Sequence, residues 1–304
     1  MATSKKIAVF GLGSMGYGIA SSCLRAGHKV YGIDIAEAPM AKFRAEGGAD
    51  GNIYDDASQL DAVVVVVLNA AQTESVLFGD NGIVPRLKSG AVVLACATMP
   101  PEFAKDMESR CGNHRVSYLD APISGGALKA ARGQLSIMAS GTQEAFSAAL
   151  PVLDATAEKV FELGDNAGAG SAMKAVNQLL AGVHIATMAE ALTFGMTQGI
   201  TPEKFTEVIS QCAGTSWMLE NRAPHIVDGD YTPHSQVNIW PKDLGIVLDA
   251  AKSSGFSAPI TAAALQQYMV AVGMGLGAED DAAIAKVYAR NAGLSLPNSN
   301  NLKE

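Results

Sequence analysis

The chain has 304 residues, of which 48% are hydrophobic and 17% charged. This composition excludes a disordered protein, which would be poorer in apolar residues and richer in charge. The length suits about two domains of ~150 residues each. The net charge of −8 comes without any cluster of basic residues, which argues against nucleic acid or an anionic membrane as a partner.

The cysteines lie far apart and form no Cys-x-x-Cys pair; they are Cys23, Cys96, Cys111 and Cys212. This spacing predicts reduced, mostly buried thiols, and neither a disulfide framework nor a zinc site. The five histidines are scattered, so we expect no metal ion.

The N-terminal region imitates a signal peptide, because apolar residues follow Lys5 and Lys6. Glycines interrupt that run, however, and no small-residue cleavage site follows it. The longest apolar run, residues 62–68, is far shorter than the ~20 residues that span a bilayer. We therefore expect a soluble, cytoplasmic protein.

The first half of the sequence alternates short apolar, β-branched runs with helical segments. We predict a helix at 14–26 and strands at 7–10, 29–34, 62–68, 91–95, 117–119, 135–139 and 160–163. Continuous apolar strands that alternate with helices are typical of a parallel sheet covered on both faces. The prediction is an α/β chain whose residues 1–165 form a doubly wound, Rossmann-type domain.

The sequence pattern of the second half predicts helices and no strands. We predict a long interdomain helix at residues 166–198. Its residues are apolar on all sides, which predicts that it is buried at a domain junction or subunit interface. Further helices are expected at 201–210, 218–222, 242–253, 260–272 and 280–291, followed by a polar tail from residue 297. Residues 199–304 are thus expected to form an all-α domain for substrate binding and oligomerisation. We expect a homodimer or homotetramer built mainly through residues after Gly164.

A glycine-rich segment follows the first strand and opens the first helix; it reads Gly11-Leu12-Gly13-Ser14-Met15-Gly16. In a dinucleotide site the first glycine permits the turn, the second lets a pyrophosphate approach, and the third allows close helix–strand packing. The helix N-terminus then offers free N–H groups to the phosphates. A glycine-rich turn without function is the alternative.

The second strand ends at Asp34, 18 residues after Gly16. A carboxylate at this place accepts the ribose hydroxyls and repels the 2′-phosphate of NADP, and no arginine follows it directly, so we predict NAD as cofactor. Two later strand ends, Leu68-Asn69 and Thr98, should border the same crevice. Asn69 and Thr98 are expected near the nicotinamide ribose, with helix or turn capping as the alternative.

A second turn follows a later strand and reads Asp120-Ala121-Pro122-Ile123-Ser124-Gly125-Gly126. Its exposed N–H groups and the Ser124 hydroxyl form a combination that can bind a carboxylate. A turn that needs glycine only for its backbone angles is the alternative, and the local pattern alone favours that alternative.

The long helix carries Lys174 among apolar residues, with Asn177 three residues later on the same face. Burial disfavours a charged amine and lowers its pKa, which makes it a usable proton donor or acceptor near neutral pH. A lysine that reaches solvent or pairs with a carboxylate is the alternative. We favour catalysis because the chain also carries a dinucleotide site.

Together these motifs, with Lys242-Asp243-Leu244, resemble the β-hydroxyacid (3-hydroxyisobutyrate) dehydrogenase family over nearly the whole chain. The resemblance implies that Lys174 is the catalytic lysine and that Asn177 orients the substrate. It implies that Ser124, Gly125 and Gly126 grip the substrate carboxylate. Thr98 and Lys242 match cofactor contacts, with Lys242 arriving from the α domain.

Within the family, residues 69–72, 180–186, 216–222 and 227–235 are most similar to enzymes that oxidise L-threonate to 2-dehydro-L-erythronate. Candidates for contacts to substrate hydroxyls are then Asn221, Arg222, His234 and Lys242; for any single one of the first three, a solvated surface group is the favoured interpretation. Other possibilities are a semialdehyde reductase of the tartronate, succinic or glyoxylate type, a 3-hydroxyisobutyrate dehydrogenase, a decarboxylating enzyme for a phosphorylated sugar acid, and a non-catalytic NAD sensor.

Overall fold

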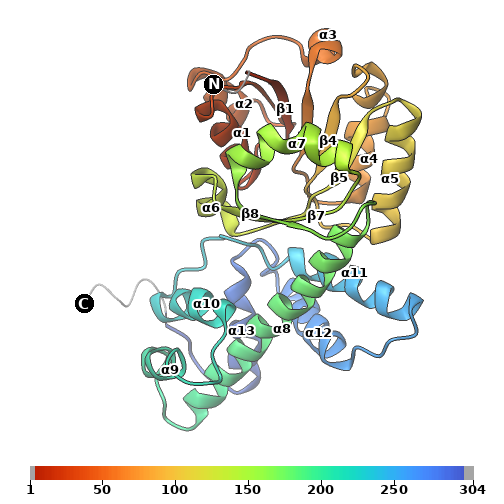
Figure 1. Ribbon diagram of the computed structural model, residues 1–304. Helices are drawn as coiled ribbons and strands as arrows, with labels where there is room; N and C mark the ends of the chain where they lie inside the picture. The colour runs from red at the N-terminus through yellow and green to blue at the C-terminus, as the bar shows by residue number, and fades with distance from the viewer. Residues whose placement is uncertain (1–3, 298–304) are drawn as a thin grey trace. The chain divides into compact units, whose positions relative to one another are not determined.

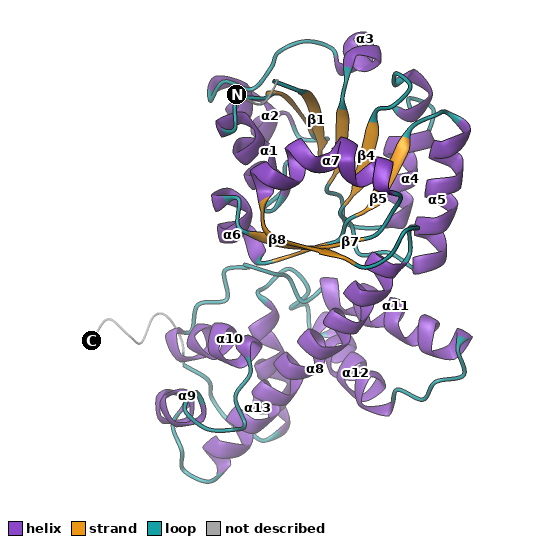
Figure 2. Cartoon of the chain, in the orientation of Figure 1, coloured by secondary structure: helices purple, strands orange, loops and turns teal. Residues whose placement is uncertain are grey.

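The computed structural model describes residues 4–297, which fall into two compact units that divide between residues 174 and 175. The strands of the described chain all belong to the first unit, and the second unit is built of helices and loops (Figure 1, Figure 2). An α/β N-terminal part followed by an α-helical part is therefore confirmed. The expected division into 1–165, 166–198 and 199–304 stays a prediction.

Five parallel strands form the main sheet, in the order β2-β1-β3-β4-β5. They are β1 (Lys6–Phe10), β2 (Lys29–Ile33), β3 (Ala62–Val65), β4 (Val92–Ala95) and β5 (Ser117–Asp120). The strand order reverses at β1, which lies between β2 and β3. Ligands of such sheets bind at the carboxyl ends of the strands beside this reversal. The Rossmann-type prediction is confirmed.

Both faces of the main sheet are covered by helices. In β1, Ile7 and Val9 point into one core and Ala8 and Phe10 into the other. Helices α1 (Gly16–Arg25) and α7 (Gln143–Thr156) contribute to the first core, and α4 (Ala70–Phe78) and α5 (Pro101–Asn113) to the second (Figure 1). Since each fully buried Val, Ile or Leu contributes roughly 1.5–3 kcal/mol, this two-sided burial holds the sheet rigid beneath its carboxyl edge. The first unit also contains α2 (Glu37–Ala45), α3 (Ile53–Asp56) and α6 (Gly126–Arg132).

The two strands expected at 135–139 and 160–163 form a second sheet instead, together with a short strand that the sequence analysis assigned to a turn. Its strands are β6 (Ile123–Ser124), β7 (Leu135–Ala139) and β8 (Ala157–Glu162), with β6 antiparallel and β8 parallel to β7. The strand expected at 62–68 also ends early, at Val65. A run of apolar residues indicates that a segment is buried, but it does not indicate which strand it pairs with or where the pairing ends. The sequence pattern therefore revealed neither the second sheet nor the early end of this strand.

The second unit packs around one apolar cluster. Its helices are α8 (Ala169–Thr197, which begins in the first unit), α9 (Pro202–Ile209), α10 (Trp217–Asp228), α11 (Ile239–Ser253), α12 (Pro259–Gly273) and α13 (Ala285–Asn291). The Trp240 and Tyr268 rings stack with centroids 5.6 Å apart, and the Tyr268 hydroxyl donates to Gly182 O at 2.9 Å. A Cβ at Gly182 would lie 2.8 Å from the Trp240 ring, so only glycine permits this packing.

The long helix is not buried on all sides in the single chain, and its burial at a domain junction or subunit interface stays a prediction. Val176 is 55%, Leu180 49% and Phe194 65% exposed, because the chain covers only part of the helix surface. By length and composition α8 could cross a membrane, but 44% of its most apolar window is buried, and core helices pass the same test.

All four cysteines are free thiols, and Cys23, Cys96 and Cys111 are buried as predicted, whereas Cys212 is exposed. Between residues 4 and 297, no group of three or more His, Cys, Asp or Glu side chains is arranged to hold a metal ion. The polar tail expected from residue 297 lies, apart from its first residue, outside the described residues.

A buried polar cluster ties α10 and the loop before α11 to residues 280 and 281. Asp281 accepts hydrogen bonds from Arg222 Nε at 2.5 Å and from Trp240 Nε1 at 3.1 Å. Asp280 Oδ1 lies 2.9 Å from His225 Nδ1, and Asp280 Oδ2 accepts the His234 amide at 2.9 Å. The solvated alternative is thus wrong for Arg222, whose guanidinium is buried against a carboxylate.

The Asp280 carboxyl leads us to predict that the second unit loses stability in acid. Burial raises the pKa of Asp280, but hydrogen bonds from His225 and from the His234 and Ala282 amides outweigh it and lower the pKa to about 2. A carboxyl with a lowered folded-state pKa contributes stability above its unfolded pKa of ~3.9, and loses it as pH falls toward 2. We expect Asp280→Asn to destabilise the unit by about 1–3 kcal/mol at neutral pH and to flatten the stability loss between pH ~4 and ~2.

Urea unfolding followed by tryptophan fluorescence measures this effect, because both tryptophans, Trp217 and Trp240, lie in the second unit. Asp249→Asn, on the exposed side of α11, is the control for loss of one negative charge. Curves of stability against pH that run parallel in the wild type and Asp280→Asn would contradict the prediction.

Candidate active site

The glycine-rich turn adopts the geometry that a dinucleotide site needs. Gly11 has φ +93°, and a Cβ on it would lie 2.2 Å from Val66 O. A Cβ on Gly16 would lie 1.8 Å from Gly11 O, so the turn and helix touch backbone to backbone. A Cβ on exposed Gly13 would meet nothing within 4 Å, which leaves open space beside that backbone. These residues fit a pyrophosphate approaching at Gly13.

Helix α1 begins at Gly16, two residues later than expected. Residues 13–15 form the turn between β1 and α1, at the carboxyl edge of the main sheet. The N–H groups at the start of a helix have no intrahelical partners and are available to an anion.

Asp34 lies directly after β2 and is anchored to the same turn. Its Oδ2 accepts the Leu12 amide at 2.7 Å, and its Oδ1 accepts the Ala36 amide at 2.9 Å. Each carboxylate oxygen has a second lone pair, so the group keeps capacity to accept ribose hydroxyls. The contact with Leu12 fixes a negative charge beside the glycine-rich turn.

Three further cofactor candidates of the first unit follow the neighbouring strands β3 and β4. Leu68 is exposed, and Thr98 is half-buried. Asn69 Oδ1 accepts the Gln72 amide at 2.9 Å and so caps α4, which is the structural alternative considered for it. Parallel strands place these residues at the same sheet edge as the glycine-rich turn, and their contact with a cofactor stays a prediction.

The glycines of the Ser124–Gly126 turn are needed for its backbone conformation, apart from any contact with a ligand. Gly125 has φ +135° and Gly126 φ +76°, conformations that favour glycine, and α6 begins at Gly126. A Cβ on Gly126 would meet nothing within 4 Å, and Ser124 is half-buried. The turn therefore needs its glycines for conformation and also borders open space.

Lys174 is buried in the first unit, with 9% of its surface exposed. Its Nζ donates a hydrogen bond to Ile123 O at 2.9 Å. Because Ile123 directly precedes Ser124, this bond brings the amine to the segment that continues into the predicted carboxylate-binding turn. The solvent-reaching alternative is wrong for Lys174.

In the second unit, two predicted site residues are linked through Gln178 and Asp243. The sequence analysis did not single out Gln178, and it named Asp243 only within the Lys242-Asp243-Leu244 motif. Asn177 Nδ2 donates to Gln178 Oε1 at 2.9 Å, and Gln178 Nε2 donates to Asp243 Oδ2 at 2.5 Å. Lys242 Nζ lies 2.6 Å from Asp243 Oδ1. Gln178 and Asp243 are both buried, and a glutamine on the buried side of an apolar helix was the available signal.

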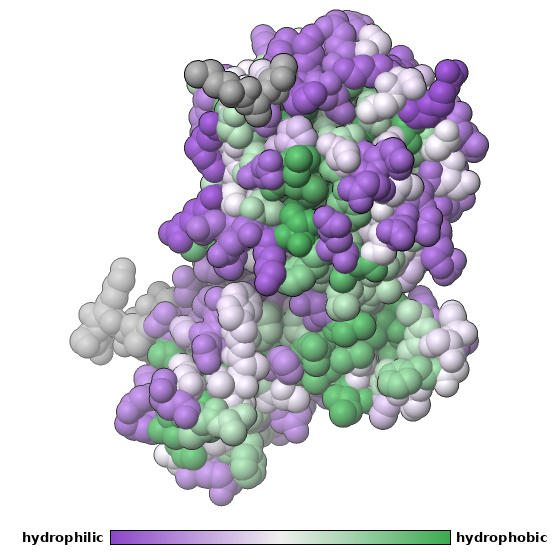
Figure 3. Space-filling view, viewed as in Figure 1, coloured by the Kyte–Doolittle hydropathy of each residue, from purple (hydrophilic) through white to green (hydrophobic). Residues whose placement is uncertain are grey.

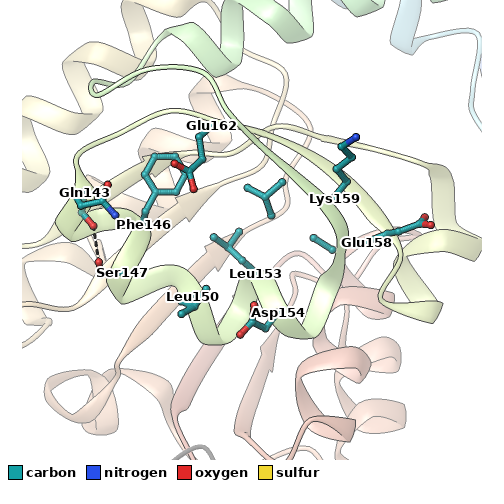
Figure 4. A pocket seen from close by; sticks show the side chains of 11 residues that line it. Gln143, Phe146, Ser147, Leu150, Leu153, Asp154, Glu158, Lys159 and Glu162 are labelled. Atoms are coloured by element: carbon teal, nitrogen blue, oxygen red, sulfur yellow. Dashed lines mark hydrogen bonds between the residues drawn. The ribbon is translucent and has the colours of Figure 1, made fainter.

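A surface hollow of about 440 Å³ lies between α7 and β8 (Figure 4). Phe146, Leu153 and Val160 form its apolar lining, with Asp154 and Glu162 among its polar groups. None of its lining residues was predicted to bind cofactor or substrate, so the hollow is not assigned to the reaction.

Two family models cover most of the chain. Residues 6–164 match the NAD-binding domain of 6-phosphogluconate dehydrogenase. Residues 168–288 match the NAD-binding domain of NADP-dependent 3-hydroxyisobutyrate dehydrogenase.

Full-length relatives and a solved structure agree with these models. The L-threonate dehydrogenase of Cupriavidus necator is 48% identical, over 97% of this chain and 98% of the relative. That of Haemophilus influenzae is 46% identical, over 96% of each chain. The crystal structure of 3-hydroxyisobutyrate dehydrogenase from Salmonella typhimurium has a TM-score of 0.88 and 44% identity, and the match covers 93% of this chain and 100% of that one. The chain belongs to the 3-hydroxyisobutyrate dehydrogenase family and is an NAD-dependent dehydrogenase that oxidises a hydroxy acid.

Proposed function

We propose that the substrate is L-threonate, oxidised at its 2-hydroxyl to 2-dehydro-L-erythronate. The observation that carries this proposal is the 43–48% identity, over nearly the full length, to five curated L-threonate dehydrogenases. The buried amine of Lys174 beside the Ser124 turn supports it, because an alcohol oxidation needs a group that accepts the hydroxyl proton.

The cofactor-binding residues in this proposal lie at the carboxyl edge of the main sheet, together with one lysine of the second unit. They are Gly11, Leu12, Gly13, Ser14, Met15, Gly16, Asp34, Leu68, Asn69, Thr98 and Lys242. When bound, NAD supplies the hydride acceptor. The turn at Gly13 would bind its pyrophosphate, and Asp34 its ribose hydroxyls.

The substrate-binding residues in this proposal are Ser124, Gly125, Gly126 and Asn177. The first three would bind the carboxylate through N–H groups and a hydroxyl, and Asn177 would orient the substrate. Neutral Lys174 would accept the proton of the 2-hydroxyl through Nζ as the hydrogen of the same carbon leaves as hydride. In the reverse direction, protonated Lys174 would return that proton to the carbonyl oxygen.

Assembly as a homodimer or homotetramer in the cytoplasm completes the proposal. Apolar surface gathers over α12 and the adjoining part of α8 (Figure 3). On these helices Leu180 is 49%, Ile260 66% and Met269 49% exposed in the single chain. A contiguous apolar patch of this kind is typical of a protein interface.

A second candidate is 3-hydroxyisobutyrate, because the Salmonella structure at 44% identity carries that activity in its name. A semialdehyde reductase would use the same residues in the opposite direction. Purified protein should therefore be assayed for NADH production with NAD and L-threonate, D-erythronate, 3-hydroxyisobutyrate or glycerate. We expect preference for L-threonate; turnover of another acid alone would refute the named substrate, and NAD binding without any turnover in either direction would favour a sensor.

Replacing the buried amine tests its proposed role. We expect Lys174→Ala to lower kcat by about 10²–10⁴-fold, the usual contribution of general acid–base catalysis, while the Kd for NADH stays unchanged. Lys159→Ala, an exposed lysine of β8, is the control. Wild-type turnover in Lys174→Ala would exclude this lysine as the base.

The carboxylate at Asp34 should set the choice between NAD and NADP. We expect Asp34→Ser to reduce the preference for NAD over NADP, expressed as a ratio of kcat/KM values, by about tenfold or more, since the repulsion of the 2′-phosphate is lost. Glu37→Gln removes an exposed charge three residues further on and should leave the ratio unchanged. An unaltered ratio in Asp34→Ser would show that Asp34 does not contact the ribose.

Light scattering at micromolar concentration tests the assembly. We expect a dimer or tetramer for the wild type and a smaller species for Ile260→Glu, because a buried unpaired charge opposes association. Leu128→Glu, at a residue 63% exposed on α6, is the matched control. A monomeric wild-type protein would contradict the prediction.

A further inference from the structure

The first turn of α8 is bound by a buried carboxylate to which the proposed reaction gives no role. Asp120, the last residue of β5, is fully buried. Its Oδ2 accepts the amides of Gly168 at 2.9 Å and Ser171 at 2.8 Å, and its Oδ1 accepts the Ser171 hydroxyl at 2.7 Å. The amides at a helix start lack intrahelical partners, and the positive end of the helix dipole also favours a negative charge there.

Ser140, directly after β7, also binds the start of α8 and lies beside Asp120. Ser140 Oγ accepts the Gly170 amide at 2.9 Å and lies 3.4 Å from Asp120 Oδ2. The backbones of Asp120 and Ser140 exchange hydrogen bonds at 3.0 and 2.9 Å. A Cβ on Gly170 would lie 2.4 Å from Met138 O, so the helix start is packed directly against strand backbone. This arrangement leaves the first turn of α8 no room to shift.

The same strand segment also contacts the proposed base. Lys174 follows Ser171 by three residues, just under one helical turn of ~3.6 residues. Its Nζ donates to Ile123 O, three residues after Asp120. Residues 120–123 therefore hold α8 at two points, the helix start and the lysine side chain. Ser124, the first residue of the proposed carboxylate-binding turn, comes next in the chain.

We propose that Asp120 and Ser171 are positioning residues that set Lys174 against the Ser124–Gly126 turn. The proposal rests on the proposed role of Lys174 as the base. Hydride and proton transfer need aligned atoms, and a misplacement of about 1 Å can cost about 10²-fold in rate. Asp120 and Ser171 would thus act on the rate through Lys174 without touching the substrate.

Ser171→Ala tests the proposal with the smallest change, because it removes one hydroxyl and leaves the backbone amides in place. We expect kcat to fall by about tenfold, with the Kd for NADH unchanged and a larger primary isotope effect for substrate deuterated at the carbinol carbon. Asp120→Asn should lower kcat further. Ser22→Ala is the matched control, since Ser22 is also buried and its hydroxyl donates to Ala130 O at 3.0 Å, away from α8.

A double-mutant cycle separates positioning from a general loss of structure. If Ser171 acts through Lys174, Ser171→Ala should lower the residual rate of Lys174→Ala no further. An equal fold loss with and without Lys174, or wild-type kcat in Ser171→Ala, would overturn the proposal. Wild-type kcat in Lys174→Ala would instead refute the proposed base, so the two failures are distinguishable. Should Asp120→Asn fail to fold, the Ser171 cycle decides.

Discussion

The hydrogen bonds between the Asp120 carboxylate and the start of α8 are the interaction on which the proposed substrate-binding part of the first unit depends. Burial raises the pKa of this carboxyl, and hydrogen bonds from Ser171, Gly168 and Ser140 oppose that rise. A buried carboxylate without these donors would cost several kcal/mol, so the helix start and the strand end stabilise each other. Because the same segment reaches Lys174 through Ile123 O, an interaction that stabilises the fold also fixes the proposed base.

The proposed cofactor-binding turn depends on a different constraint, the close approach of two backbone segments. Gly11 and Gly16 touch through backbone atoms, and Asp34 accepts the Leu12 amide, so contacts within the chain fix the shape of the turn. A turn prepared in this way lowers the ordering cost of binding. In the proposed reaction, fixed backbone at the sheet edge and a fixed lysine on α8 would supply the alignment that hydride transfer between two small molecules requires.

The sequence predicts the local features well because their causes are local. The Gly-x-Gly-x-x-Gly turn, the parallel strands and the carboxylate at Asp34 follow from residues close together in the chain. The separate second sheet was missed because hydrophobic runs do not specify strand partners. The burial of Arg222 against Asp281 joins residues 59 positions apart, and no local pattern reveals such a pair. Gln178 was missed because one polar residue in an apolar helix has many ordinary explanations.

Chemical rescue of Lys174→Ala by small primary amines tests the central claim most directly. If Lys174 is the base, turnover of the deficient variant should rise with the concentration of unprotonated amine, and the wild type should not respond. A Lys174→Ala enzyme that keeps the wild-type rate, or one whose rate depends on pH as the wild type does and ignores added amine, would contradict the account.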